Sequence, residues 1–91
     1  MDARARIVVH GMVQGVGFRY FAYRQATIRG LKGYVRNRPD GTVETVVEGE
    51  RGMIEDYVRE LNIGPRYARV TRVDVQWEPF VGEFKSFEVR F

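Results

Sequence analysis

The segment GMVQGVGFRY, residues 11–20, combines three glycines with an arginine two residues past the last of them. Gly15 and Gly17 can adopt positive φ, which lets the N–H groups between them turn toward a common centre. A helix is predicted to begin near Phe18, so Arg19 would lie in its first turn, where the helix dipole disfavours a cation. An anion held between the amides and the guanidinium would compensate, and a guanidinium suits phosphate oxygens. The residues favour anion binding, although the glycines could simply permit a tight turn from strand to helix.

Asn37 is a second candidate for a functional residue, because it lies where a predicted strand meets a turn. The residues that follow it, RPDG, contain a proline that fixes φ and an Asp-Gly pair that tolerates a tight reversal. Asn37 could therefore simply initiate this turn. A strand-helix-strand order, however, makes the first two strands parallel, with the third inserted between them. The carboxyl ends of the two strands then meet at one edge of the sheet, which places Asn37 close to the glycine loop.

The hydrophobic periodicity predicts the elements that position these residues. Strands are expected at residues 5–13, 31–38, 42–48, 70–78 and 84–91, and helices at 18–29 and 51–62. The order β-α-β-β-α-β with a short extra strand predicts an α+β fold, the ferredoxin-like sandwich. This is an antiparallel sheet of four to five strands with two helices packed on one face. Residues 1–91 are expected to form a single domain. Its expected core aromatics are Phe18, Phe21, Tyr57, Trp77 and Phe87.

Several motifs carry a resemblance to a known family. GMVQGVGFR at residues 11–19 and GYVRNRPDGTVE at residues 33–44 resemble the two signatures of the acylphosphatases. VEG at residues 47–49 and FEVRF at residues 87–91 are also similar to that family, so the resemblance covers essentially the whole chain. It implies a ferredoxin-like fold and the hydrolysis of acyl phosphates to a carboxylate and inorganic phosphate. It also implies that the reaction uses no metal, no cofactor and no covalent intermediate.

The same resemblance implies roles for individual residues. Arg19 is the phosphate-binding arginine, and Asn37 positions the attacking water. The loop supplies backbone donors, so the implied phosphate-binding residues are Gln14, Gly15, Val16, Gly17, Phe18 and Arg19. Separately, Phe91 is the last residue, and we expect its carboxylate near the site as an orienting partner of Arg19.

Other catalytic chemistry has little support in the sequence. His10 is the only histidine, so a metal cluster would need the carboxylates of Asp40, Glu44 and Glu48, which we expect to be solvated. No metal site is therefore predicted. Ser86 is the only serine, and no histidine lies near it in the pattern, so a Ser-His-Asp triad is not expected.

The composition bounds the partners and the location. The chain has 91 residues, of which 44% are hydrophobic and 30% charged, with no cysteine and a formal net charge of +3. This describes an ordinary globular protein that favours anionic partners and has no disulfide. Because we find neither an apolar run of membrane-spanning length nor a signal-peptide stretch, we expect no membrane partner and a cytoplasmic location. The expected partners are small acyl phosphates, with inorganic phosphate or sulfate as ligands.

Two other functions remain open. An RNA-binding module shares the βαββαβ layout and the basic charge, but it would expose aromatic residues on its central strands. The segment TVETVVEG at residues 42–49, which contains the third predicted strand, has no aromatic residue and carries acids on the alternate face of that strand, so no specific nucleic acid is expected. A non-catalytic anion binder would keep the same site without turnover. Catalytic release of phosphate without added metal would distinguish an enzyme from such a binder.

Overall fold

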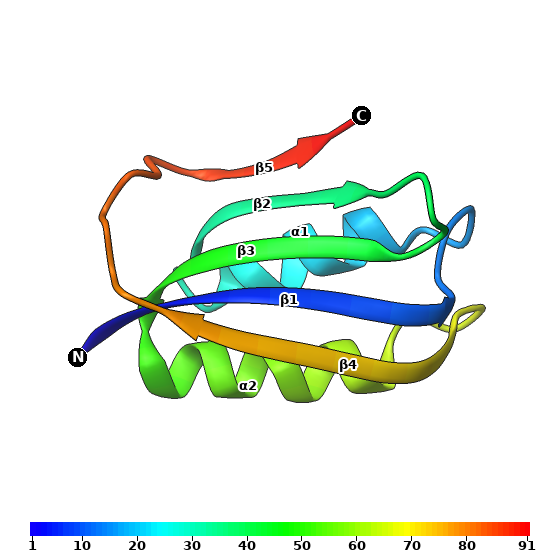
Figure 1. Ribbon diagram of the computed structural model, residues 1–91, viewed down its shortest axis with the longest axis horizontal. Coiled ribbons are helices and arrows are strands. Elements are labelled where there is room, and N and C mark those ends of the chain that lie inside the picture. The colour runs from blue at the N-terminus through cyan, green and yellow to red at the C-terminus, as the bar shows by residue number, and fades with distance from the viewer.

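The computed structural model describes residues 1–91, which form five strands and two helices. In chain order these are β1 (Asp2–Met12), α1 (Phe18–Ile28), β2 (Lys32–Asn37), β3 (Val43–Glu50), α2 (Arg51–Ile63), β4 (Arg69–Glu78) and β5 (Phe87–Arg90). All seven predicted elements are present in the predicted order. The strands form one sheet with the order β4-β1-β3-β2-β5, and they pass in front of α1 in Figure 1.

The strand pairing brings the carboxyl ends of β1 and β2 to one edge. β3 is antiparallel to both of these strands and lies between them, as predicted, so β1 and β2 run in the same direction. Figure 1 shows the end of β1 and the turn from β2 to β3 at the same end of the molecule. β4 is also antiparallel to β1, but β5 is parallel to β2, so the sheet is antiparallel in four strands and mixed in total. β4 ends at the end of the sheet where β2 begins. The chain crosses to the far edge at this same end, so β5 starts beside the start of β2 and runs parallel to it.

The core lies between the sheet and the two helices. On α2, the side chains of Ile54, Tyr57 and Leu61 form an apolar stripe that is completely buried. On α1 the buried residues are Phe18 and two alanines, and Ile28 at its end is 70% exposed. Small residues on the buried face of α1 allow this helix to lie close to the sheet.

The hydroxyl of the buried tyrosine of α2 has a hydrogen-bond partner on the sheet. The hydroxyl of Tyr57 lies 2.8 Å from the hydroxyl of Thr45 on β3, and both side chains are fully buried. Burial raises the pKa of Tyr57, although the hydrogen bond with Thr45 opposes this. A neutral phenol with a partner avoids the cost of an unpaired buried polar group.

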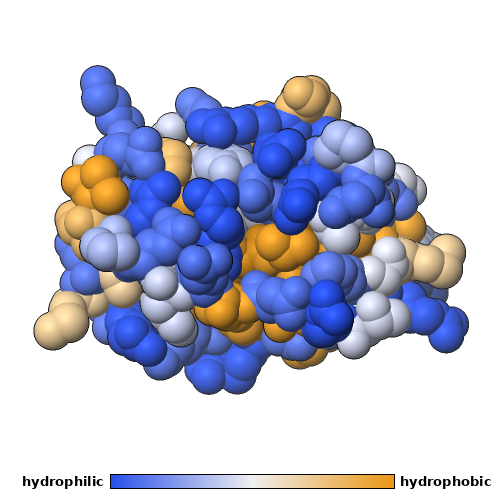
Figure 2. Space-filling model, in the orientation of Figure 1, coloured by the Kyte–Doolittle hydropathy of each residue, from blue (hydrophilic) through white to orange (hydrophobic).

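The face of the sheet away from the helices is covered by charged side chains. We call this surface the ion-pair face, and its main members are Arg4, Arg6, Arg36, Glu44, Glu48 and Glu78. Arg36 Nε and Arg6 Nη1 lie 2.7 and 2.9 Å from the carboxylate of Glu44. Arg4 lies 3.2 Å from the carboxylate of Glu48 and 3.0 Å from that of Glu78. Figure 2 shows that this side of the molecule is mainly hydrophilic, with a small apolar area near its centre.

The expectation that Glu44 and Glu48 are solvated is therefore wrong. Their exposed fractions are only 6% and 4%. β3 is the central strand, so arginine side chains from the strands on either side extend over its acids. In addition, the backbone amides of residues 81–83 close over Glu48 and donate to it. An alternating pattern identifies the face on which an acid lies, but not what covers that face.

The expectation that Trp77 belongs to the core is also wrong. Its exposed fraction is 36%, because it lies near the end of the edge strand β4. The guanidinium of Arg51 lies 3.9 Å from the ring centroid, a cation–π contact that covers part of the ring. The other four predicted core aromatics are buried or packed against the core cluster.

Neither helix of the molecule could span a lipid bilayer, because α1 and α2 both lack the length and apolar character needed to cross it.

Candidate active site

The loop between β1 and α1 presents a row of unpaired backbone donors. Gly15 and Gly17 have φ values of 75° and 78°, so both adopt the left-handed conformation expected for them. From Gln14 to Tyr20, no backbone N–H donates to an acceptor within the chain; the first paired amide is that of Phe21, which bonds to the Gly17 carbonyl at 3.0 Å. The loop and the first turn of α1 thus expose consecutive donors to solvent or to a ligand.

The N-terminus of α2 shows how such donors are normally satisfied. There the carboxylate of Glu50 accepts hydrogen bonds from the amides of Gly52 and Met53, at 3.0 and 3.1 Å. α1 has Gly17 at the same position, with no side-chain cap and no acid in the first turn. An external anion at α1 would do what the Glu50 carboxylate does at α2.

Arg19 adds a positive charge that the chain does not neutralise. Its Nη1 donates to the carbonyl of Arg90 at 3.2 Å, and its guanidinium lies 4.5 Å from the ring centroid of Phe91. Arg19 takes part in none of the ion pairs of the molecule. We call the amides of Gln14–Tyr20 together with this guanidinium the anion cradle.

Phe91 lies at the site, but the kind of contact differs from the expected one. The aromatic ring, rather than a carboxylate, approaches Arg19, and the preceding carbonyl of Arg90 accepts the hydrogen bond. The guanidinium is thereby oriented by a neutral acceptor and by a ring face, both of which leave its charge available.

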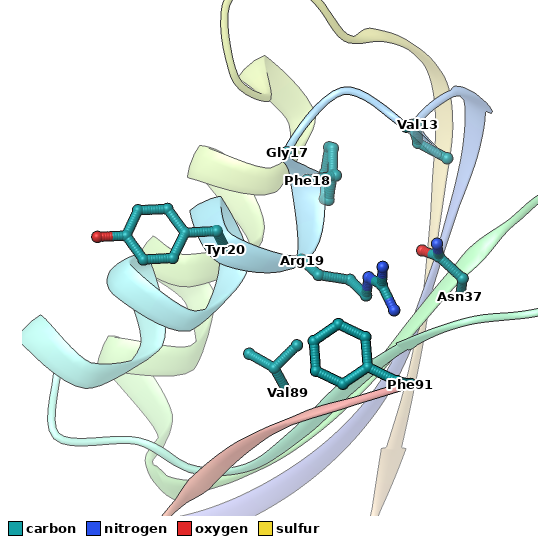
Figure 3. A pocket seen from close by; sticks show the side chains of 9 residues that line it. Val13, Gly17, Phe18, Arg19, Tyr20, Asn37, Val89 and Phe91 are labelled. Carbon is teal, nitrogen blue, oxygen red and sulfur yellow. The ribbon is translucent and has the colours of Figure 1, made fainter.

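Asn37 is the last residue of β2 and faces the anion cradle. Its backbone pairs with Val43 of β3, which holds the residue at the edge of the sheet. Its side chain is half-buried and makes no hydrogen bond within the chain. Figure 3 shows its carboxamide directed toward the guanidinium of Arg19, whereas the ring of Tyr20 points away from both. The predicted proximity of Asn37 and the glycine loop is confirmed.

A cavity of about 300 Å³ joins these groups. Its lining residues are Val13, Gly15, Gly17, Phe18, Arg19, Tyr20, Asn37, Val89 and Phe91. Two of the predicted loop residues, Gln14 and Val16, do not line it: Val16 packs against the core, and the side chain of Gln14 bonds to the carbonyls of Arg38 and Thr42.

Val89 and Arg90 are site residues that the sequence patterns did not identify. They lie on β5, which reaches the cavity only because it pairs in parallel with β2, and a partner across the sheet leaves no local pattern in the sequence. The FEVRF ending at residues 87–91, noted for its family resemblance, was the one signal that could have indicated them.

His10 and Ser86, which the sequence did not favour as catalytic residues, make ordinary structural contacts. His10 Nε2 is 3.0 Å from a carboxylate oxygen of Asp74 on the neighbouring strand, and the carbonyl of Ser86 accepts from the amide of Gly33. No group of three histidine, aspartate or glutamate side chains is arranged to hold a metal ion.

Comparisons with known proteins agree with this geometry. The family model described as acylphosphatase matches residues 5–89. The acylphosphatase of Pelotomaculum thermopropionicum is 49% identical over 89 residues, covering 98% of this chain and 97% of the relative. The crystal structure of acylphosphatase from Bacillus subtilis superimposes with a TM-score of 0.94 at 36% identity, over 100% of both chains. A crystal structure of full-length HypF in the phosphate- and nucleotide-bound form matches with a TM-score of 0.91 and 34% identity; this chain is fully covered but corresponds to 12% of that protein. Because a family model and a near-full-length relative agree, the chain belongs to the acylphosphatase family.

Proposed function

We propose that the acylphosphatase activity of this protein takes place in the cavity between α1, β2 and β5, with Arg19 and Asn37 as its catalytic residues. The observation that carries the proposal is that three kinds of polar group with free hydrogen-bonding capacity lie around one cavity. These are the backbone amides of the loop, the guanidinium of Arg19 and the carboxamide of Asn37. Each is a group that the phosphoryl group of an acyl phosphate or an attacking water would satisfy.

The anion cradle suits the phosphoryl group of an acyl phosphate. Its amides and guanidinium are in place before the substrate arrives, so they can stabilise the charge on the phosphoryl oxygens without reorganising. The guanidinium offers two parallel donors, and Gly15 and Gly17 leave open space over the backbone, since a Cβ built at either position meets no atom within 4 Å.

The chemistry needs little beyond this positioning. Water attacks the phosphorus, the bond from phosphorus to the acyl oxygen breaks, and the carboxylate leaves with the bonding electron pair. Because a carboxylate is a good leaving group, no general acid is required. What remains is to hold the phosphoryl group and to place the water in line with the leaving oxygen.

Asn37 is suited to placing the water but not to taking its proton. A carboxamide oxygen accepts a hydrogen bond from the water, while the amide group can donate to a phosphoryl oxygen. A carboxamide is not a base at neutral pH, so we propose that the proton passes to an oxygen of the substrate itself. The products are then a carboxylate and inorganic phosphate, and the reaction needs no metal.

RNA binding fits the surface less well than acyl phosphate hydrolysis does. On the ion-pair face, the ring of Tyr34 is covered by the guanidinium of Arg90 at 3.9 Å, so it is not available for a nucleobase to stack on. We therefore propose small acyl phosphates as the substrates, phosphate or sulfate as ligands, and no specific nucleic acid. We also propose a cytoplasmic location, which fractionation of cells making the tagged chain would test.

Alanine substitutions at the two catalytic residues test the proposal. Removing one preorganised donor commonly costs about 10²–10³ in rate, so Arg19→Ala and Asn37→Ala should each lose at least this much activity on benzoyl phosphate. The midpoint temperature of thermal unfolding of each variant should lie within a few degrees of the parent value, because neither side chain is part of the core cluster. The assay is run with a chelator present. A folded variant that turns over at the parent rate would remove that residue from the mechanism.

A further inference from the structure

The loop that carries the anion cradle is attached to the rest of the molecule by few hydrogen bonds. The backbone N–H and C=O groups of residues 13–16 make no backbone hydrogen bond. The side chains of Val13 and Phe18, both almost fully buried, anchor the two ends in the core. Among residues 13–16, the side chain of Gln14 makes the only hydrogen bonds to the rest of the chain.

Gln14 connects the cradle to the turn that follows Asn37. Its Nε2 donates to the carbonyl of Arg38 at 2.8 Å and to the carbonyl of Thr42 at 2.9 Å. Because both partners are acceptors, the amide group must face them, and both of its protons are used. Arg38 is the residue immediately after Asn37, and Thr42 immediately precedes Val43, which pairs with Asn37 across the sheet.

The turn that Gln14 contacts is itself closed by hydrogen bonds. The amide of Arg38 donates to the Thr42 carbonyl at 2.9 Å, and the amide of Gly41 donates to the Arg38 carbonyl at 3.1 Å. The carboxylate of Asp40 accepts from both the amide and the hydroxyl of Thr42. Each carbonyl therefore has one bond inside the turn and one from Gln14, which fills its two lone pairs. Gln14 thus bonds to a rigid part of the chain.

We propose that Gln14 is a positioning residue, which sets the place of the anion cradle relative to the water-positioning carboxamide of Asn37. The inference rests on the proposed function of these two groups. The phosphoryl group is held on the loop and the water on β2, so in-line attack depends on the relative position of two segments that no backbone hydrogen bond joins. Misplacement by about 1 Å can cost roughly 10² in rate. The side chain of Gln14 bridges the two segments without lining the cavity.

The variants Gln14→Ala and Gln14→Met test this role. Methionine keeps the length and apolar stem of the side chain but has no donor, so it remains informative if the alanine variant fails to fold. We expect kcat on benzoyl phosphate to fall by about 10- to 100-fold, while the inhibition constant of inorganic phosphate changes by less than about threefold. The phosphate is held by the cradle alone, whereas turnover needs cradle and carboxamide in register. Gln76→Ala is the matched control, because Gln76 is exposed on β4 and should keep the parent values.

A double-variant cycle with Asn37→Ala separates positioning from general loosening of the fold. Once Asn37 no longer holds the water, its register with the cradle has no effect, so Gln14→Met should cost less than about threefold in that background. Equal losses in both backgrounds would overturn the proposal, as would a phosphate inhibition constant that rises in proportion to the loss of kcat. A parent rate in the Gln14 variants alone would overturn only this inference. A parent rate in Asn37→Ala would overturn it together with the proposed function.

Discussion

The anion cradle and the ion-pair face use the same side chain, arginine, in opposite states. On the ion-pair face, Arg4 contacts three glutamates, two of them at 3.0 and 3.2 Å, and its own exposed fraction is 9%. At the cradle, Arg19 is held by a carbonyl and a ring, and no carboxylate reaches it. The first arrangement neutralises the charge and holds strands and a loop together, whereas the second leaves the charge without an ion-pair partner.

The difference comes from where acids lie relative to the sheet. The central strand β3 carries Glu44 and Glu48 on the face away from the helices, where arginines of β1 and β2 can reach them. Around the cavity, by contrast, the lining residues include no aspartate or glutamate. Since an internal carboxylate would compete with phosphate for the guanidinium, a cradle without acids is a condition for binding.

An acid placed in the cavity should pair with Arg19, as the glutamates of the ion-pair face pair with their arginines. Of the changes that compare the two regions, we expect this one to have the largest effect on the protein. Val89 lines the cavity beside Phe91 and Arg19 (Figure 3), so Val89→Glu would bring a carboxylate to the guanidinium. Two unit charges about 5 Å apart interact by about 3 kcal/mol at an effective dielectric constant of about 20. We therefore expect kcat/KM for benzoyl phosphate to fall by at least about 10²-fold. Val89→Gln is the neutral control and should lose much less; equal losses in the two variants would show that size, not charge, was responsible.

Neutralising an acid on the ion-pair face should instead reduce stability. The carboxylate of Glu48 accepts hydrogen bonds from the amides of Val81, Gly82 and Glu83, at 2.8, 2.9 and 3.1 Å. Glu48→Gln cannot accept all of these and places an amide group against donors, so it should lower the free energy of unfolding by about 2 kcal/mol. Urea denaturation measures this.

Glu55→Gln is the control for that variant. Glu55 is half exposed on α2 and pairs only with Arg51, so its replacement should change stability by less than about 0.5 kcal/mol. Turnover at a temperature where Glu48→Gln is folded should match the parent. A loss of turnover in this folded variant would show that the two regions are not independent.

The smallest effect should be seen in the acid dependence of stability. Burial alone would raise the pKa of Glu44, but the hydrogen bonds from Arg36 and Tyr34 outweigh it and hold the pKa below its ordinary value of 4.5. Because this pKa is lowered in the folded state, the contribution of Glu44 is complete above about pH 4.5 and is lost as the pH falls through the folded value. Glu44→Gln should therefore be less stable than the parent at neutral pH, and the two should converge in acid, by at most about 1.4 kcal/mol per pH unit.

Urea denaturation of the parent and of Glu44→Gln at several pH values between 7 and 3 would follow this convergence. A stability difference that stays constant over the whole range would mean that Glu44 contributes by its shape and not by its charge.

Local patterns were sufficient for the elements and for most of the site. The hydrophobic periodicity correctly indicated the helix α2, and the glycines of the loop have the positive φ expected of them. The rule that strands joined through a helix run parallel correctly placed Asn37 near the loop. Each of these inferences depends on contacts within a few residues or on the direction of the chain, which the order of residues specifies directly.

The errors have a common physical origin. Trp77 is in the right register on β4, but it lies near the end of an edge strand, where the guanidinium of Arg51 covers only part of its ring. Glu44 and Glu48 look solvated in the sequence, yet they are buried under arginines from other strands. In each case the burial of a side chain depends on neighbours distant in the sequence, which alternation alone does not reveal.

The order of residues alone determined the fold class, the family, and the bare loop that ends in Arg19, because backbone preferences and apolar spacing are local properties. Only the tertiary structure decided which arginines keep a free charge, that β5 supplies the carbonyl and ring beneath Arg19, and that Gln14 bridges the loop to the turn after Asn37. These features depend on which strands become neighbours, and hydrogen bonds and ion pairs form between whatever groups the folded sheet brings within reach.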